Sequence, residues 1–394
     1  MLRRRFLPVC LGAAFVHAQP QRRMEPIPAA PPAPPSGGAG PFAGKRWRAQ
    51  YLFDDDKWSA LLADFCCPSP ERALAALWLE SEYRRRFAAV ISREPGAPWT
   101  EVPLKDRPLS FFALDEKHVW LVGGKSLWFS AESGFAWQKR GLPKSSRGRL
   151  AQRVHFVDAQ NGWAFGPGKT FHRTADGGAS WKPVAECAGL ALKEENTVWT
   201  AMTFLDARHG LIAGYSDPRR NDGERLPDWM LPERAARRRP VPITTAAGET
   251  RDGGATWKFS VTSAFGRPAR LRSSGTQGIA IYHYGENFAY SSEVFALDFR
   301  TGASRPVFRR SDYQVHDAAL LEGGAVILAA IQTIGGLRSS PVPGRLRILY
   351  SADLEKWEQM PVDYRAEGRR AMLATPAAGS LWAATDLGCV LRLV

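Results

Sequence analysis

The sequence predicts an all-β fold, a seven-bladed β-propeller of four-stranded blades, and two observations lead to this prediction. An eight-residue motif, called the repeated phrase below, occurs twice, as residues 174–181 and 250–257, and degenerate copies of it occur elsewhere in the 394 residues. Tryptophans at the ends of these copies recur with a period, which is the mark of a repeat protein. Helical periodicity is almost absent, and this excludes a helical solenoid.

The spacing of the tryptophans gives the number of units. Trp99 and Trp137 are 38 residues apart, and Trp181 follows 44 residues later. The 76 residues to Trp257 fit one unit with a 32-residue insertion, and the 100 residues from there to Trp357 fit two units. Together with a unit that begins at an earlier tryptophan, Trp47, these spacings give seven repeat units.

That early tryptophan also closes the ring. Trp47 lies 52 residues before Trp99, close to the start of the repeats. We therefore expect the N-terminal strand around Trp47 to complete the last blade. Between Trp257 and Trp357, residues 301–305 form a decayed copy of the phrase in which Arg305 stands where tryptophan is expected.

Each unit carries the strand pattern that a blade requires. In residues 153–166 an apolar strand meets an Asp/Asn/Gly turn and then a second apolar strand, and residues 111–123 and 202–214 repeat this order. Four short strands per unit are typical of a propeller blade. Growth by repetition explains how roughly 350 residues form one domain, residues 45–394.

The repeated phrase suits a tight turn between the third and fourth strands of a blade. Its carboxylate can accept backbone N–H groups of the turn, its glycine can take a positive φ, and its tryptophan starts the next strand. We therefore expect a structural role for the phrase residues Thr174, Asp176, Gly178, Ser180, Trp181, Thr250, Asp252, Gly254, Thr256 and Trp257.

The N-terminal residues predict export. Residues 1–18 combine three arginines, an apolar run and a small-residue cleavage site, as in a signal peptide, and the arginines also suit a twin-arginine signal. Residues 19–44 are rich in Pro, Ala and Gly and read as a flexible linker. We expect a periplasmic or secreted protein, exported by the Sec or the twin-arginine route, with no transmembrane segment.

Four cysteines remain after cleavage. A disulfide from Cys66 or Cys67 to Cys389 is one possibility, because the first and last blades are neighbours in a closed ring, and buried free thiols are the other. No Cys/His spacing indicates a metal site, so we expect neither a metal ion nor a cofactor.

The net charge of +14 comes mainly from arginine. Export argues against nucleic acid as the partner, since an exported protein does not meet it. A generally basic, solvated surface and a surface for an acidic partner both fit this composition.

The long loops predict where a partner would bind. In a four-stranded blade, the loop between strands two and three lies on the face opposite the repeated phrase. This loop is long in the first, fifth and sixth units and carries the insertion at about 217–242 in the fourth. Arginine and aromatic residues are enriched in binding hot spots. The candidate binding residues are Arg84, Arg85, Arg86, Arg219, Arg220, Trp229, Arg237, Arg238, Arg239, His283, Tyr284, Glu286, Tyr290 and Arg338.

The phrase at residues 174–181 and 250–257 resembles the Asp-box, or bacterial neuraminidase repeat. The complete unit at 156–181 looks like the photosystem II stability and assembly factor family of seven-bladed propellers. That resemblance implies a non-enzymatic exported scaffold whose arginine patch engages acidic or membrane-protein partners. We therefore expect a monomeric binding or assembly scaffold for a protein or polysaccharide, with no catalytic residues.

Asp-boxes also occur in sialidases and xyloglucan-cleaving glucanases, so a sialidase-like glycoside hydrolase or a glycan-binding lectin is the alternative. Sialidases carry an Arg-Ile-Pro segment, an arginine triad and a Tyr/Glu nucleophile pair. No Arg-Ile-Pro occurs in this sequence. Tyr284 with Glu286 is the nearest candidate pair, but two residues apart on a loop is not the arrangement of that family.

Overall fold

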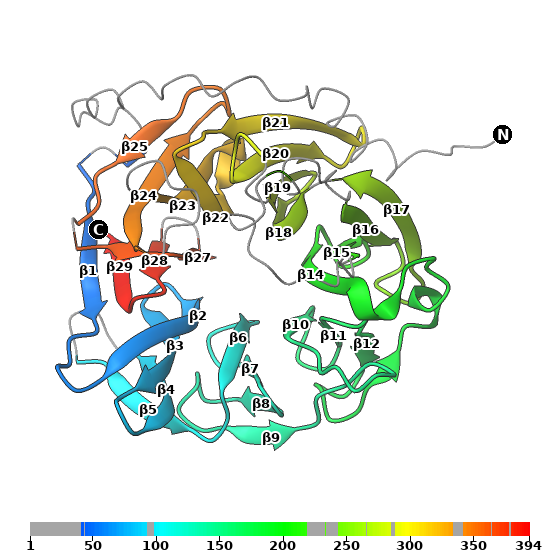
Figure 1. Cartoon of the computed structure of the whole chain (residues 1–394), viewed down its shortest axis with the longest axis horizontal. Helices are drawn as coiled ribbons and strands as arrows, with labels where there is room; N and C mark the ends of the chain where they lie inside the picture. The colour runs from blue at the N-terminus through cyan, green and yellow to red at the C-terminus, as the bar shows by residue number, and fades with distance from the viewer. Residues whose placement is uncertain are drawn as a thin grey trace.

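The computed structural model describes residues 41–42, 44–92, 98–218, 233, 243–264, 266–284, 288–333, 342–363, 365–377 and 380–394. These residues form seven sheets arranged in a ring, a seven-bladed β-propeller (Figure 1). This confirms the predicted fold class and blade number. Helical structure in the described residues is confined to short pieces, among them the 3₁₀ turns η2 (Ala185–Cys187), η3 (Glu194–Asn196) and η5 (Glu322–Gly324).

Each blade is a four-stranded antiparallel sheet whose strands follow one another from the ring axis outward. Blades 1 to 3 consist of β2 (Ser59–Ser69), β3 (Arg72–Glu80), β4 (Arg85–Ile91) and β5 (Thr100–Leu104); β6 (Pro108–Ala113), β7 (Val119–Gly123), β8 (Leu127–Ser130) and β9 (Gln138–Arg140); and β10 (Arg153–Phe156), β11 (Gly162–Phe165), β12 (Phe171–Thr174) and β13 (Lys182–Pro183).

The next three blades continue around the ring. Blades 4 to 6 consist of β14 (Thr197–Phe204), β15 (Gly210–Ser216), β16 (Ile243–Thr250) and β17 (Lys258–Ala264); β18 (Arg267–Ser274), β19 (Gln277–His283), β20 (Ser292–Asp298) and β21 (Ala303–Arg309); and β22 (Tyr313–Leu320), β23 (Val326–Gln332), β24 (Gly344–Ser351) and β25 (Glu358–Met360), with the short β26 (Glu367–Gly368) beside β24.

Blade 7 joins the two ends of the domain. It consists of β27 (Ala371–Ala377), β28 (Ser380–Thr385), β29 (Cys389–Leu393) and, on the outside, β1 (Trp47–Leu52). Trp47 pairs with Leu393 in this sheet, so the first strand of the domain completes the last blade. The predicted closure around Trp47 is confirmed.

The turns between the third and fourth strands, called the repeat turns below, are held by their own side chains. In blade 3, Asp176 accepts the backbone N–H of Ser180 at 2.9 Å and its hydroxyl at 2.5 Å. Thr174 Oγ1 donates to the same carboxylate at 2.7 Å and accepts the N–H of Gly178, which has a φ of 92°. These hydrogen bonds lower the pKa of Asp176 well below its ordinary value. The turn at 250–257 repeats the pattern.

The tryptophans that end the repeat turns of blades 3 and 4 pack against the preceding blade. Trp257 of blade 4 lies with its ring centroid 5.1 Å from Phe171 and 6.2 Å from Trp163, both in blade 3. Trp181 of blade 3 donates its indole N–H to the carbonyl of Gly141, which follows blade 2. Buried aromatic pairs of this kind bind one blade to the next.

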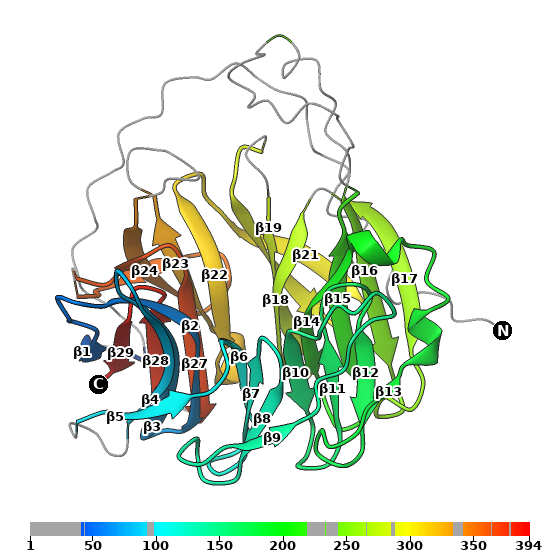
Figure 2. The same cartoon turned by 60° about the horizontal axis from the view of Figure 1, so that its bottom comes forward.

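The two ends of the ring therefore differ. The repeat turns lie at one end, and the loops between second and third strands lie at the other, here called the loop end (Figure 2). This follows from antiparallel pairing, because successive connections alternate between the two ends of a sheet.

The four cysteines among the described residues, Cys66, Cys67, Cys187 and Cys389, are free thiols. Cys67, Cys187 and Cys389 are buried, and burial raises the pKa of Cys187 to about 11 and of Cys389 to about 12. The structure therefore favours buried thiols over the disulfide that the sequence left open.

Candidate functional site

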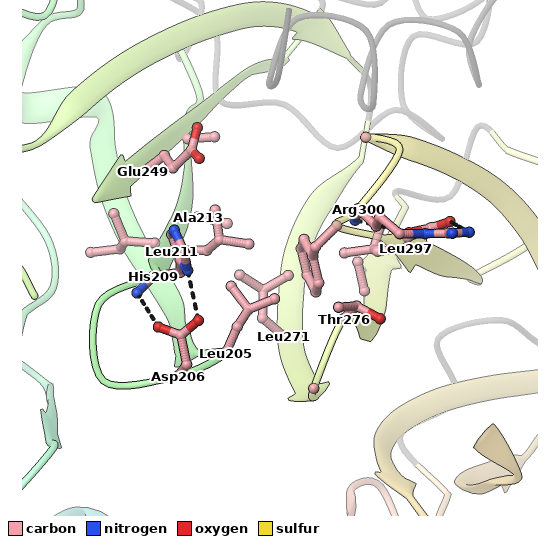
Figure 3. Close-up of a pocket in the computed structure, with 18 of the residues that line it drawn as sticks. Leu205, Asp206, His209, Leu211, Ala213, Glu249, Leu271, Thr276, Leu297 and Arg300 are labelled. Atoms are coloured by element: carbon pink, nitrogen blue, oxygen red, sulfur yellow. Dashed lines mark hydrogen bonds and ion pairs between the residues drawn. The ribbon is translucent and has the colours of Figure 1, made fainter. Parts of the chain in front are cut away.

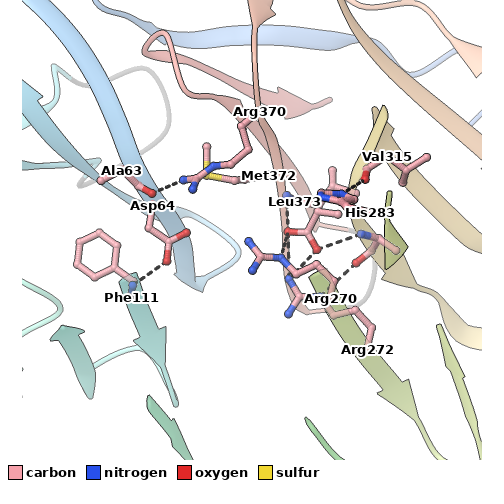
Figure 4. A network of polar contacts seen from close by, with 12 residues as sticks. Ala63, Asp64, Phe111, Arg270, Arg272, His283, Val315, Arg370, Met372 and Leu373 are labelled. Atoms are coloured by element: carbon pink, nitrogen blue, oxygen red, sulfur yellow. Dashed lines mark hydrogen bonds and ion pairs between the residues drawn. The ribbon is translucent and has the colours of Figure 1, made fainter. Parts of the chain in front are cut away.

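Charged side chains gather where the innermost strands of the blades approach the ring axis (Figure 4). In addition to a shift in β27, five of these strands, β2, β6, β14, β18 and β22, carry a register shift of the bulge type. A bulge re-aims the side chains beside it. The residues that follow the shifts in these five strands are Asp64, Ser110, Ala201, Arg270 and Asp317.

Arg153 of blade 3 lies at the same level as these residues. Its partner in the second strand is Phe165, the fourth residue of β11. The partner of Asp317 is Ala329, which is likewise the fourth residue of its strand, β23. Equal register in a ring of like blades means equal depth along the axis. The charges of Asp64, Arg270, Asp317 and Arg370 all act on Arg153, so arginine and aspartate side chains from distant parts of the chain share a common region.

Asp317 is the main counter-ion in this region, and it is almost fully buried, with 2% of its side chain exposed. Arg272 Nη2 donates to both of its oxygens, at 2.9 and 3.1 Å, and Arg270 Nε lies 3.6 Å away. The same carboxylate accepts the backbone N–H of Leu373 in blade 7. Asp317 thus connects blades 5, 6 and 7.

The second carboxylate, Asp64, is held in the same manner. It accepts the backbone N–H of Phe111 in blade 2 at 2.8 Å. Beside it, Arg370 donates to the carbonyl of Ala63, so blade 7 is also tied to blade 1. Both carboxylates are therefore engaged in joining neighbouring blades.

Positive charge exceeds negative charge in this group, which we call the axial arginine cluster: Arg153, Arg270, Arg272, Arg370, Asp64 and Asp317. Four guanidinium groups face two carboxylates. Burial, followed by the like charge of Arg270, lowers the pKa of Arg153 to about 10. With four arginines and two aspartates, the region carries a formal excess of two positive charges.

Some of the hydrogen-bonding capacity of the cluster is unused. The Nε atoms of Arg270 and Arg370 are buried and have no hydrogen-bond partner among the described residues. Arg272 is 43% exposed although it stands on an innermost strand, so solvent reaches this part of the axis. Buried donors without partners are costly, and an anion that accepts from them relieves that cost.

Three histidines border the cluster and are neutral at pH 7. Burial lowers the pKa of His155 to about 4, and the charge of Arg272 acts in the same direction. His283 donates from Nε2 to the carbonyl of Val315 at 2.7 Å, and its ring lies edge-on to that of His316. Burial lowers the pKa of both of these imidazoles.

The predicted arginines of blade 1 lie at the loop end, and two of them have carboxylate partners of their own. Arg85 forms an ion pair with Glu80, and Arg86 pairs with Glu101 while lying over the ring of Trp58. Arg84 is exposed in the turn between β3 and β4. Their charges are therefore partly balanced within the blade.

The predicted residues of blade 5 form a separate cluster at the loop end. Tyr284 donates its hydroxyl to Glu293 at 2.8 Å, and Arg309 pairs with the same carboxylate. Tyr290 lies under the guanidinium of Arg309 and is 36% exposed. The structure brings Tyr284 and Tyr290 together around Arg309, whereas His283 belongs to the axial side.

The remaining predicted binding residues lie outside the described residues: Arg219, Arg220, Trp229, Arg237, Arg238, Arg239, Glu286 and Arg338.

Sequence reasoning missed the axial arginine cluster. The available signal was a charged residue next to apolar residues in an innermost strand, as at Arg153 before Val154 and at Asp317 before Ala318. Burying such a charge is unfavourable unless it is paired, so each one marks a special position. Which of them meet is visible only once the ring is assembled.

No group of three or more His, Cys, Asp or Glu side chains suited to hold a metal ion occurs among the described residues. Within the same part of the chain, no helix combines the length and the apolar character needed to cross a membrane.

The fold defines the class of protein, a seven-bladed β-propeller, and comparison with known proteins gives its structural neighbours. No family model matches the sequence, and no curated protein matches it. The solved structure described as YCF48 bound to D1 peptide is similar to this chain, with a TM-score of 0.53 and 15% identity over 88% of this chain and 96% of that one. YCF48 from Cyanidioschyzon merolae has the same TM-score at 13% identity, covering 88% and 98%.

A glycoside hydrolase shares the fold as well. The GH74 xyloglucanase from Xanthomonas campestris is similar with a TM-score of 0.57 and 13% identity, over 88% of this chain. This chain spans 53% of the length of that enzyme. At such identities the likeness concerns the fold, which supports many unrelated functions.

Proposed function

We propose that this protein is an exported, non-enzymatic propeller that binds an acidic segment of a protein partner. The axial arginine cluster and the loop end of the ring would form the binding surface. The observation that carries the proposal is the imbalance of the cluster, in which four arginines face two carboxylates that are already engaged.

The chemistry of the cluster favours carboxylates as ligands. A guanidinium presents several N–H donors in a planar fork that matches a carboxylate, and such charge-assisted hydrogen bonds are strong. Among the described residues, Arg370 Nε is buried with no hydrogen-bond partner, and Arg270 Nε has only its 3.6 Å contact with Asp317. A glutamate or aspartate side chain would supply the missing acceptors and balance the excess charge.

A polypeptide is the favoured source of these carboxylates. A neighbour of the same fold, YCF48, has been solved bound to the D1 peptide, so this architecture can hold a peptide. The export signal expected at residues 1–18 would bring this chain to partners outside the cytoplasm. Arg84 at the loop end, and the arginines that the sequence predicts for binding in the insertion at 217–242, would add to the basic surface.

A glycan-processing function is the second candidate, because the xyloglucanase shares the fold and blade 5 contains a hydrogen-bonded Tyr284 and Glu293 pair. Burial and the charge of Glu293 raise the pKa of Tyr284 far above its ordinary value. A nucleophilic tyrosine requires easier loss of its proton, so this environment favours a structural role. A screen against sialosides and plant or bacterial polysaccharides, measuring both turnover and binding, tests this candidate.

Calorimetry with a hexaglutamate peptide tests the main proposal. We expect the wild type to bind hexaglutamate and not hexaglutamine, with affinity that falls as salt rises. The double variant Arg153→Gln, Arg370→Gln should bind at least tenfold more weakly. The control Arg208→Gln removes an exposed arginine from the repeat-turn end and should leave binding unchanged.

A second set of variants tests the loop end. Replacing Arg237, Arg238 and Arg239 with alanine should weaken hexaglutamate binding without altering the melting temperature. Equal affinity in the wild type, the axial double variant and the triple variant would contradict the proposal.

A further inference from the structure

A cavity of about 450 Å³ lies between blades 4 and 5, at the repeat-turn end of the ring (Figure 3). Its walls are mostly apolar and come from strands two and three of blade 4 and from blade 5. The lining includes Leu211, Ala213, Ala247, Leu271, Ala280 and Leu297. This cavity is distinct from the axial arginine cluster.

The cross-strand register explains why the cavity exists. In blade 4, Thr250 pairs with Gly210, and the pairing of Glu249 with Lys258 places Trp257 opposite Thr250. This register brings the indole of Trp257 onto blade 3. The residue of blade 5 that corresponds to Trp257 is therefore the one with the equivalent cross-strand partners.

In blade 5, Gly278 pairs with Leu297, and Leu297 pairs with Ser304. Ser304 thus occupies the place that Trp257 holds in blade 4. The sequence pattern predicts Arg305 for this place, and the prediction is wrong by one residue, because Arg305 pairs with Ala296. Blade 5 lacks the tryptophan that would pack against blade 4.

At other interfaces between blades, a tryptophan from the repeat turn fills this place. Trp181 reaches blade 2, and Trp357 of blade 6 lies against blade 5, where it contacts Phe308 edge-on and donates to the carbonyl of Val307. Cross-strand partners share one face of a sheet. Ser304 therefore lies on the same face as Leu297, which lines the cavity.

Neighbouring side chains do not fill the space. The buried core between blades 4 and 5 includes Ala201, Ala213 and Ala280, whereas the core between blades 3 and 4 contains Trp163 and Trp199. A void lined by apolar atoms loses dispersion contacts and gains them when an apolar group enters. An apolar cavity of about 150 Å³ already accommodates benzene.

The rim of the cavity is polar and internally paired. The carboxylate Oδ2 of Asp206 lies 2.6 Å from Nδ1 of His209, and Arg251 Nε donates to Glu249 Oε1 at 2.6 Å. Nη2 of Arg300 lies 3.9 Å from Oδ2 of Asp298. Each carboxylate of the rim has a partner on its own blade. Such an entrance favours an uncharged ring over an ion.

We propose that this cavity binds a tryptophan side chain of a partner polypeptide, which takes the place of the indole that blade 5 lacks. The aromatic chemistry of the site follows from the cavity and the register alone. The choice of a polypeptide as the source of the ring rests on the proposed function.

Calorimetry and ligand-detected NMR with two probes test this site. The probes are indole and the capped peptide Gly-Gly-Trp-Gly-Gly, with Gly-Gly-Ala-Gly-Gly as the negative control. We expect the wild type to bind indole and the tryptophan peptide and not the alanine peptide. Failure of both aromatic probes would overturn the site, and binding of indole without the peptide would overturn the polypeptide source.

Variants at adjacent positions locate the binding. Ser304→Trp should fill the cavity, raise the melting temperature and weaken binding of both probes at least tenfold. Arg305→Trp adds the same indole one residue along, on the other face of the sheet, and should leave binding unchanged. Ala247→Leu fills the cavity from blade 4 and provides the same test if Ser304→Trp does not fold.

Two results would overturn the assignment to this cavity: unchanged binding in both filling variants, or loss of binding in Arg305→Trp alone. The probes carry no acidic side chain, so their failure leaves hexaglutamate binding, and with it the proposed function, separately testable. Failure of hexaglutamate with success of indole would remove the acidic-segment proposal and keep the cavity.

Discussion

Arg272 of blade 5 donates to both carboxylate oxygens of Asp317 in blade 6, at 2.9 and 3.1 Å. The same aspartate accepts a backbone N–H from blade 7. One buried carboxylate therefore holds three blades together and balances part of the axial charge. A side chain in this position contributes to both stability and electrostatics.

Asp317→Asn is expected to destabilise the protein by about 2 to 4 kcal/mol, because it leaves Arg272 and the largely buried Arg270 without their counter-ion. Urea unfolding followed by circular dichroism measures this. The matched control is Asp312→Asn on the same blade, where the partly exposed Arg310 pair should contribute less than about 1 kcal/mol. Equal losses in the two variants would show that Asp317 is not a special contact.

The repeat turn of blade 4 gives a steric test at two neighbouring glycines. Gly253 and Gly254 have φ of 70° and 80°, so alanine at either is strained by about 1 kcal/mol. At Gly254, an added Cβ would also overlap the ring of Trp163 in blade 3. Gly254→Ala should therefore lose about 1 to 3 kcal/mol more than Gly253→Ala in urea unfolding. Identical losses would mean that the turn does not press on the neighbouring blade.

His155 makes stability depend on pH. Its pKa falls from an ordinary value of 6.5 to about 4 on folding, so the unfolded chain binds more protons between these values. Stability should thus be complete above pH 6.5 and fall as the pH drops towards 4. The contribution of this one group is on the order of 1 to 3 kcal/mol.

The variant His155→Gln isolates that contribution. Burial lowers the pKa of His283 and His316 as well, so the variant should still lose stability in acid, but along a shallower slope than the wild type. Urea midpoints at several pH values between 7 and 4 measure the difference. Parallel slopes in the two proteins would contradict this role of His155.

The blade number and the closure of the ring could be predicted because they depend on local, repeated chemistry. Trp181 and Trp257 each end a turn whose hydrogen bonds lie within eight residues, and their spacing counts the blades. Closure required only one more tryptophan, Trp47, before the first complete unit. Local signals of this kind survive in a single sequence.

The axial arginine cluster could not be predicted in the same way. Arg153, Arg270 and Arg370 are at least a hundred residues apart, and no local motif links them. They meet because seven innermost strands share one axis and five of them shift register at the same level. The place of Ser304 also needed the structure, since it depends on which residue pairs with Leu297.

A crystal structure of the protein with bound hexaglutamate tests the central claim most directly. We expect peptide carboxylates within hydrogen-bond distance of the guanidinium groups of Arg153, Arg270 or Arg370, with the Nε donors of the last two engaged by the peptide. A peptide bound elsewhere, with these three side chains unchanged and without an added acceptor, would contradict it.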